Sequence, residues 1–315
     1  MSHRKIKEPK IKQSLRHDAA AWLQQQAYDQ GRSHDFEQHI MLLGAESVRW
    51  RADRHLPDMS SVPLGTPRAN GDTVDLPAGA QPYGPKAWPI LQIDTSQLFG
   101  MDESLPRSPA GILVLYAIGP TVKSWKRDYV LKFYPHVLDS LRQPTALTRH
   151  MTPIHAEKEG SEQNTWVGEP ISLRPQGSLS YPGPLGLEHI TDSRYGPSAA
   201  FFAGMQTEYE SWRFQWCFGD NPFKGIHNCI SSGIQMFGHP VIRSLPALVG
   251  GQTGDADWIV LLQVGSPYWA VAPKTKVDLV KIDDGCCHIV YLVPKDDWEK
   301  GNIDRLVMRR IPDSF

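Results

Sequence analysis

The fold of this chain is decided by Trp88-Pro89-Ile90-Leu91-Gln92-Ile93 and its near-repeat, Trp258-Ile259-Val260-Leu261-Leu262-Gln263-Val264. After each stretch comes a spacer of similar length, and then a glycine opens a second apolar run, Gly111–Tyr116 in one place and Gly285–Val293 in the other. Short continuous apolar runs bounded by turn residues are typical of buried strands. The repeat therefore predicts two copies of one strand–excursion–strand unit.

A Gly/Pro turn signal precedes each copy, at Pro63–Pro67 and at Gly238-His239-Pro240. We therefore predict an α+β fold that is internally duplicated: two related, mostly antiparallel sheet halves pack as one unit, with an N-terminal helical segment. The expected divisions are a helical segment (1–55), a first half (56–135), a connecting region with an aromatic helix (136–236) and a second half (237–315).

Local patterns fill in the remaining elements. Capping and propensity predict helices over Ser14–Gly31 and Asp35–Leu43. Residues 56–88 are rich in Pro and Gly and lack periodicity, so we expect an irregular excursion that is either functional or packed as extended chain on a neighbour. Apolar runs predict further strands at Tyr129–Tyr134 and Ile171–Leu173.

Composition excludes several classes of protein. An apolar content of 40% and a charged content of 21% are those of a globular chain. The 33 Lys and Arg residues nearly cancel the 34 Asp and Glu residues, so global charge favours neither nucleic acid nor a membrane as partner. No run approaches the roughly 18 apolar residues of a membrane helix, and no signal-peptide pattern is present. Four cysteines make no disulfide framework in a chain of this length, so we expect a cytoplasmic location.

Candidate metal ligands occur at His150, His155 and Glu157. Their spacing is not the i, i+4 pair of a helical zinc site, and Pro153 opposes a helix there. We therefore expect no metal and no cofactor.

No motif for a nucleophile, a phosphate or a dinucleotide is present. Cys217 and Cys229 lack a family signature around them. We expect no catalytic residue. The alternative is an enzyme that uses His and carboxylate groups, such as Glu188 and His189, in a cleft between the two halves.

The strongest functional candidate is an aromatic stripe in Phe201–Phe218. Phe202, Met205, Tyr209, Trp212 and Trp216 are spaced three and four apart, which predicts one helical face. Core packing explains such a stripe, and so does a partner surface, because Trp, Tyr and Arg anchor protein interfaces. The candidate partner-binding residues are Tyr209, Trp212, Arg213, Trp216, Phe218 and Asp220, together with Asp283 and Asp284, whose charge would complement a basic partner.

Gln92 and Gln263 occupy equivalent ends of the repeated strands. A buried amide must have hydrogen-bond partners, so we expect each Gln to tie its strand end to the adjacent irregular loop. A paired ligand site across the two halves is the other possibility. Gly238, Pro240 and Gly285 are expected to shape the turns of the second copy.

The order of these motifs resembles the YwqG-like proteins, a bacterial family of unknown function. The second copy carries the resemblance through Gly238-His239-Pro240, Leu261–Val264, Asp283-Asp284-Gly285 and Asp296-Asp297-Trp298, and the first copy through Leu91–Asp94. The resemblance covers roughly residues 60 to 310 and is weak between 120 and 235. It implies an α+β fold with an internal pseudo-two-fold axis.

The chain departs from that family after the second repeated strand, where Gly265–Trp269 replaces an acidic stretch. A ligand site built on that stretch in relatives would be missing here. The resemblance implies no chemistry. We therefore expect a non-enzymatic, cytoplasmic protein-binding protein, most concretely an immunity protein that binds and neutralises a cognate, secreted antibacterial toxin, with neither a membrane nor nucleic acid as partner.

Overall fold

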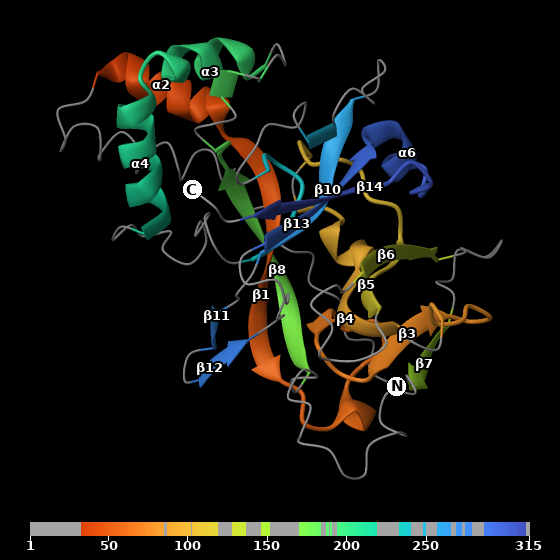
Figure 1. Cartoon of the computed structure of the whole chain (residues 1–315). Helices are drawn as coiled ribbons and strands as arrows, with labels where there is room; N and C mark the ends of the chain where they lie inside the picture. The colour runs from red at the N-terminus through yellow and green to blue at the C-terminus, as the bar shows by residue number, and fades with distance from the viewer. Residues whose placement is uncertain are drawn as a thin grey trace, which may run out of the picture.

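The computed structural model describes residues 33–84, 87–101, 103–118, 128–136, 146–151, 170–183, 187–188, 190, 194–218, 233–240, 248–249, 257–265, 269–272, 275–278 and 287–312. Strands predominate over helices (Figure 1). The helices are α2 (His34–Leu43), η1 (Met59–Ser61), η2 (Thr95–Leu98), α3 (Gly196–Ala203), α4 (Gln206–Phe218) and α6 (Lys295–Glu299). The strands are β1 (Ala45–His55), β2 (Arg68–Ala69), β3 (Thr73–Pro77), β4 (Ala87–Asp94), β5 (Gly111–Ile118), β6 (Asp128–Pro135), β7 (Leu147–Met151), β8 (Ile171–Ser180), β9 (Ile234–Met236), β10 (Trp258–Val264), β11 (Trp269–Ala272), β12 (Thr275–Asp278), β13 (Cys287–Pro294) and β14 (Val307–Pro312).

Ten of the described strands form one sheet in the order β14-β13-β10-β9-β1-β8-β2-β4-β5-β6. Each neighbouring pair is antiparallel. The long strands β1 and β8 lie side by side at its centre (Figure 1). Two small ribbons, β3–β7 and β11–β12, complete the described strands. The predicted α+β class and the mostly antiparallel pairing are therefore confirmed.

The order of strands is similar on the two sides of the central pair, β1 and β8. Beyond β1 come β9, β10, β13 and β14, and beyond β8 come β2, β4, β5 and β6. Both repeated strands also carry a bulge at the same place: β4 skips Ile90 against β5, and β10 skips Leu261 against β13. Each skipped residue lies two positions before the repeated glutamine, Gln92 or Gln263. A bulge bends its strand and increases the local twist, which helps a sheet to curl.

The sheet curls around one apolar core that both sides share. Leu91 and Leu115 from β4 and β5 join the same buried cluster as Leu262 and Tyr291 from β10 and β13. The largest buried side chain of this cluster on the central strands is Trp50 of β1. One shared core binds the two sides of the sheet into a single unit.

Curling also brings the two terminal strands, β6 and β14, towards each other. Phe133 of β6 packs edge-on against Trp298 of α6, with ring centroids 5.2 Å apart. Arg310 of β14 reaches the carboxylate of Asp128 at 3.8 Å, and its guanidinium carbon lies 5.7 Å from the ring centroid of Tyr129. These side chains cover the seam between the two ends of the sheet.

Helices α2, α3 and α4 form a layer at one end of the central strands (Figure 1). Ser33 caps α2 by accepting a hydrogen bond from the backbone N–H of Phe36, and Phe36 is buried in the aliphatic and aromatic cluster of this layer. No helix among the described residues is long and apolar enough to cross a membrane.

The aromatic segment 201–218 is two helices rather than the single helix predicted. The chain leaves helical hydrogen bonding at Gly204 and Met205, between α3 and α4. Phe202 of α3 nevertheless packs against Tyr209 of α4, with ring centroids 5.0 Å apart. The apolar spacing therefore identified residues of one cluster, although two helices share them.

The sequence prediction was right for the repeated strands and wrong for the central one. The runs at 89–94, 111–118 and 258–264 are strands β4, β5 and β10, and Asp35–Leu43 is helical. Ala45–His55, which was assigned to the N-terminal helical segment, is instead strand β1. Arginines interrupt its apolar alternation. The helix predicted over Ser14–Gly31 lies outside the described residues.

Candidate functional site

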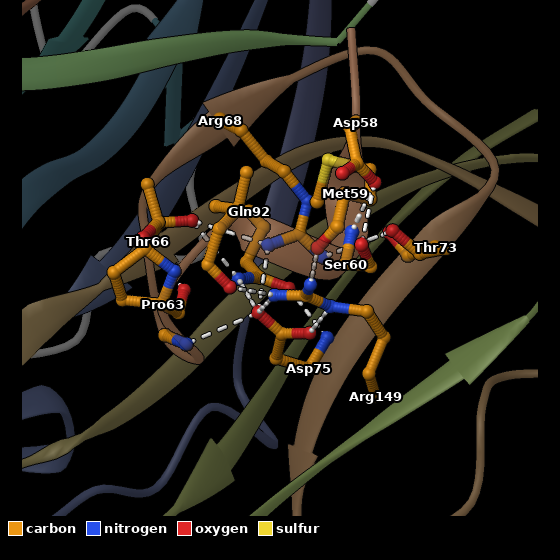
Figure 2. Close-up of polar contacts among 12 residues, drawn as sticks. Asp58, Met59, Ser60, Pro63, Thr66, Arg68, Thr73, Asp75, Gln92 and Arg149 are labelled. Carbon is orange, nitrogen blue, oxygen red and sulfur yellow. Dashed lines mark hydrogen bonds and ion pairs between the residues drawn. The ribbon is translucent and has the colours of Figure 1, made fainter. Parts of the chain in front are cut away.

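A group of polar and charged side chains, most of them buried, lies where the β3–β7 ribbon packs on the main sheet. It consists of Asp75 of β3, Arg68 of β2, Gln92 of β4 and Arg149 of β7, and we refer to it as the Asp75 cluster (Figure 2). Asp75 is 0% exposed and Arg68 is 1% exposed, whereas Arg149 is 18% exposed at its side chain. Burial of three charges at one place requires that they be paired and hydrogen-bonded.

The carboxylate of Asp75 accepts hydrogen bonds from all sides. Its Oδ1 atom accepts from Nε of Arg149 at 2.7 Å. Its Oδ2 atom accepts from Nη1 of Arg68 at 2.8 Å, Nη2 of Arg149 at 3.1 Å, the backbone N–H of Gly65 at 3.0 Å and Nε2 of Gln92 at 3.4 Å. Five donors therefore converge on two oxygens (Figure 2).

Both arginines also donate hydrogen bonds to backbone carbonyl oxygens. Arg68 donates to the carbonyl oxygens of Thr73 at 3.0 Å and Thr66 at 3.2 Å. Arg149 donates to the carbonyl oxygens of Met59 and Val62. The cluster thereby fastens residues 59–66, strand β3 and strand β7 to one another.

Electrostatics keep Asp75 ionised. Burial alone would raise the pKa of the Asp75 carboxyl, but the hydrogen bonds from Arg149 and the charge and hydrogen bond of Arg68 outweigh it and lower the pKa to about 2. A general acid or base at neutral pH needs a pKa near the working pH and room for a substrate proton. Asp75 has neither property, and the geometry is that of a structural clamp.

Gln92 acts as the sequence predicted for it. Its Oε1 atom accepts from the backbone N–H of Asp75 at 2.7 Å, and its Nε2 atom donates to the carbonyl oxygen of Thr66 at 3.2 Å. The amide therefore ties the end of β4 to the adjacent irregular chain. Gln263 is buried in β10 opposite Gln235 of β9, which in turn donates to the carbonyl oxygen of Phe237.

Gly238 and Pro240 shape the turn after β9. Gly238 has φ +74°, and a Cβ atom there would lie 2.1 Å from Oγ of Ser180 and 2.9 Å from Cβ of Ser47. Only glycine fits this position without displacing β1 or β8. Pro240 is buried beside it, and the intervening His239 donates its backbone N–H to Ser180.

The aromatic candidates of α4 face the interior. Tyr209, Trp212 and Arg213 are buried, and Tyr209 donates its hydroxyl to the carbonyl oxygen of Pro182 at 2.9 Å. Trp212 packs edge-on against Tyr181, with ring centroids 4.9 Å apart. These three side chains therefore offer no surface to a partner, and packing of α4 on the end of β8 accounts for the two aromatic ones.

The other candidates lie outside the described residues or side chains. Trp216 and Phe218 belong to α4, but their side chains are outside the described part. Positions 220, 283, 284 and 285 (Asp220, Asp283, Asp284 and Gly285) lie outside it altogether.

Of the His and Glu residues considered for a metal or an enzyme, only His150 and Glu188 lie in the described part of the chain. His150 belongs to β7, while His155 and Glu157 are outside the described residues. Within the described part, no group of three metal-ligating side chains occurs. Glu188 is exposed, and His189 is outside the described part.

A serine–histidine pair joins two helices of the helical layer. Nδ1 of His39 on α2 lies 3.1 Å from Oγ of Ser198 on α3. The His39 ring also stacks on Phe201, with ring centroids 4.1 Å apart. Ser198 is almost completely buried, so its hydroxyl is inaccessible to a substrate and the pair serves helix packing.

Sequence reasoning missed Arg68, Asp75 and Arg149. The available signal was Asp75 itself, a carboxylate in the otherwise apolar or neutral stretch Thr73–Pro77. A buried strand with one carboxylate predicts cationic partners. Arg68 lies only seven residues away, but Arg149 lies 74 residues away in sequence and cannot be identified from spacing.

Large apolar side chains are exposed beside the Asp75 cluster. Met151, at the end of β7, is 70% exposed, and Leu64, in the segment held by Arg149, is 49% exposed. Leu64 precedes Gly65, where an added Cβ atom would lie 3.0 Å from the side chain of Leu147 on β7. The clamp therefore presents apolar surface on a fixed backbone.

Comparison with known proteins gives no family for this chain: no family model matches it, and neither does any curated protein.

Proposed function

We propose that this protein is a non-enzymatic protein-binding protein, most concretely an immunity protein that binds a cognate antibacterial toxin and neutralises it. The observation that carries the proposal is the exposure of Met151 and Leu64 on the backbone fixed by the Asp75 cluster. Exposed large apolar side chains can mark a protein interaction site. A rigid backbone lowers the entropy lost on association.

The Asp75 cluster itself is unsuited to acid–base catalysis. Both carboxylate oxygens of Asp75 accept hydrogen bonds from other groups of the protein. These hydrogen bonds hold β3, β7 and residues 59–66 together. The nearly neutral chain also favours recognition by shape and apolar contact over long-range steering.

The test is affinity capture of the tagged full-length protein from its native cells, followed by reciprocal capture with the partner so identified. We expect a near-stoichiometric partner. Expression of that partner alone should arrest growth, and co-expression with this protein should restore it. A partner that binds but never arrests growth would refute the immunity role, and the absence of any partner would refute the binding role.

We also propose that the two sides of the sheet descend from one duplicated unit, with β1 and β8 as equivalent strands. The register supports this proposal. Gln92 pairs with Arg68 and Val114, and Gln263 pairs with Gln235 and Val290. Extended to the central pair of strands, the same correspondence makes Arg51 of β1 equivalent to Arg174 of β8. These two residues are cross-strand neighbours, so the two-fold axis would pass between them. To test this proposal, each half would be expressed alone. We expect each half to assemble into a dimer whose circular dichroism spectrum matches that of the whole chain.

A further inference from the structure

The β3–β7 ribbon has two edges, and the fold covers only one of them with described residues. On the β3 side, Arg68 donates to the carbonyl oxygen of Thr73, and Gln92 accepts from the backbone N–H of Asp75. These side chains therefore bond the backbone groups of β3 that a neighbouring strand would otherwise bond. Unpaired strand edges are usually protected in this way or by charge, because they can add another strand.

The backbone groups on the β7 side point away from β3 at alternate residues. The N–H of Ala78 donates to the carbonyl oxygen of Ala146. This bond shows which residue pairs of the β3–β7 ladder are the hydrogen-bonded ones. In an antiparallel pair such positions alternate with unbonded ones. Leu147, Arg149 and Met151 therefore turn their N–H and C=O groups outward. Among the described strands, β3 is the only neighbour of β7 (Figure 1).

This edge differs from the two ends of the main sheet. There, β6 and β14 approach each other and are covered by contacts such as Phe133 with Trp298. On β7 the cation that would discourage strand addition, Arg149, is turned into the Asp75 cluster. Thr148 and Met151 are exposed. Among the described residues, the β7 edge thus combines backbone groups without a neighbouring strand, exposed apolar surface and a backbone held in place.

We propose that the β7 edge, together with Met151 and Leu64, is the surface on which a protein partner adds an extended segment as a third strand of the ribbon. An alternating row of donors and acceptors at strand spacing is complementary to an extended polypeptide, which specifies the occupant. Apolar side chains at alternate positions of that segment would contact Leu147 and Met151. This inference rests on the proposed function and assigns a place to it.

The experiment uses the full-length protein and a random linear peptide library displayed on phage. Met151→Lys places a charge on the edge, and Leu42→Lys is the matched control, because Leu42 is a 54% exposed apolar residue on α2. We expect selected peptides to carry alternating apolar residues. They should bind wild type and Leu42→Lys equally and Met151→Lys about tenfold more weakly. Hydrogen exchange at the amides of Arg149 and Met151 should slow when peptide binds.

Several outcomes would overturn the inference. The first is a failure to enrich any peptide, and the second is equal binding of the selected peptides by wild type and Met151→Lys. The third is protection of the Arg149 and Met151 amides from exchange in the free monomer, which would mean that the edge is already covered. Concentration-dependent dimerisation that protects these amides would assign the edge to a second copy.

The same variants separate this inference from the proposed function. If a cellular partner is captured equally by wild type and Met151→Lys, the protein is a binding protein but the β7 edge is not its site. If wild type captures nothing, the proposed function itself fails.

Discussion

Replacement of Asp75 by Asn should be among the most destabilising single changes of a polar residue in this protein. Asn keeps the size of the side chain but removes the charge, and its NH2 group would face the donors of Arg68 or Arg149. Arg68, which is 1% exposed, would then be a buried cation without its counter-ion. Breaking such a pair from one side typically costs about 3–5 kcal/mol.

An independent magnitude comes from the pKa of Asp75. The pKa is about 2 in the folded protein against 3.8 for an ordinary carboxyl, and this difference corresponds to roughly 2 kcal/mol of stability at neutral pH. Because the folded pKa is depressed, the contribution is complete above pH 3.8 and is lost as the pH falls towards 2. Wild type should therefore lose more stability between pH 5 and pH 2 than Asp75→Asn does.

The assay is urea unfolding of the full chain followed by tryptophan fluorescence, with Trp50 in the core as one reporter. Asp297→Asn is the control, because Asp297 pairs with Arg305, which is 57% exposed, and an exposed pair contributes little. If Asp75→Asn unfolds within about 1 kcal/mol of wild type, the cluster is not a clamp and the reasoning fails.

Three further changes test other parts of the fold by the same unfolding measurement. Gly238→Ala should cost at least about 2 kcal/mol more than Gly79→Ala, because both glycines have positive φ but only at Gly238 would the new Cβ meet Ser180; equal losses would contradict the steric argument. Trp298→Ala should cost about 3–5 kcal/mol by removing a completely buried side chain at the seam between β6 and β14, and a loss below about 1 kcal/mol would show that the seam contributes little. Tyr209→Phe should cost roughly 1 kcal/mol by leaving the carbonyl oxygen of Pro182 without its donor, while a neutral result would mean that water replaces the hydroxyl.

The repeated strands were predictable because their signal is local. A continuous apolar run between turn residues identifies a buried strand without knowledge of its neighbours, and Trp88–Ile93 and Trp258–Val264 are both strands. Strand β1 escaped prediction because Arg49, Arg51 and Arg54 break the apolar pattern of Ala45–His55. A central strand can carry arginines only where its second face meets polar partners, such as Gln176, which accepts from Arg51 at 3.2 Å.

The candidate site depended more heavily on tertiary structure. The spacing of Phe202, Tyr209 and Trp212 picked out members of one cluster, although they lie on two helices and not on the one helical face predicted. The same spacing fits a core stripe and an exposed interface equally well. Burial against Tyr181 and Pro182 decides for the core. Nothing in the sequence around Met151 distinguished it from an ordinary strand residue.

By itself, the sequence determined the apolar strands, the turns before them and the buried glutamine at the end of β4, since each depends on residues within a few positions of one another. The tertiary structure decided which strands are neighbours, that Asp75 meets Arg149 across 74 residues, and that Met151 is left exposed. The physical reason is that local conformation follows from short-range sterics and periodicity. Pairing of buried charges and exposure of an edge are properties of the whole packed chain, in which distant segments either cover a group or leave it open.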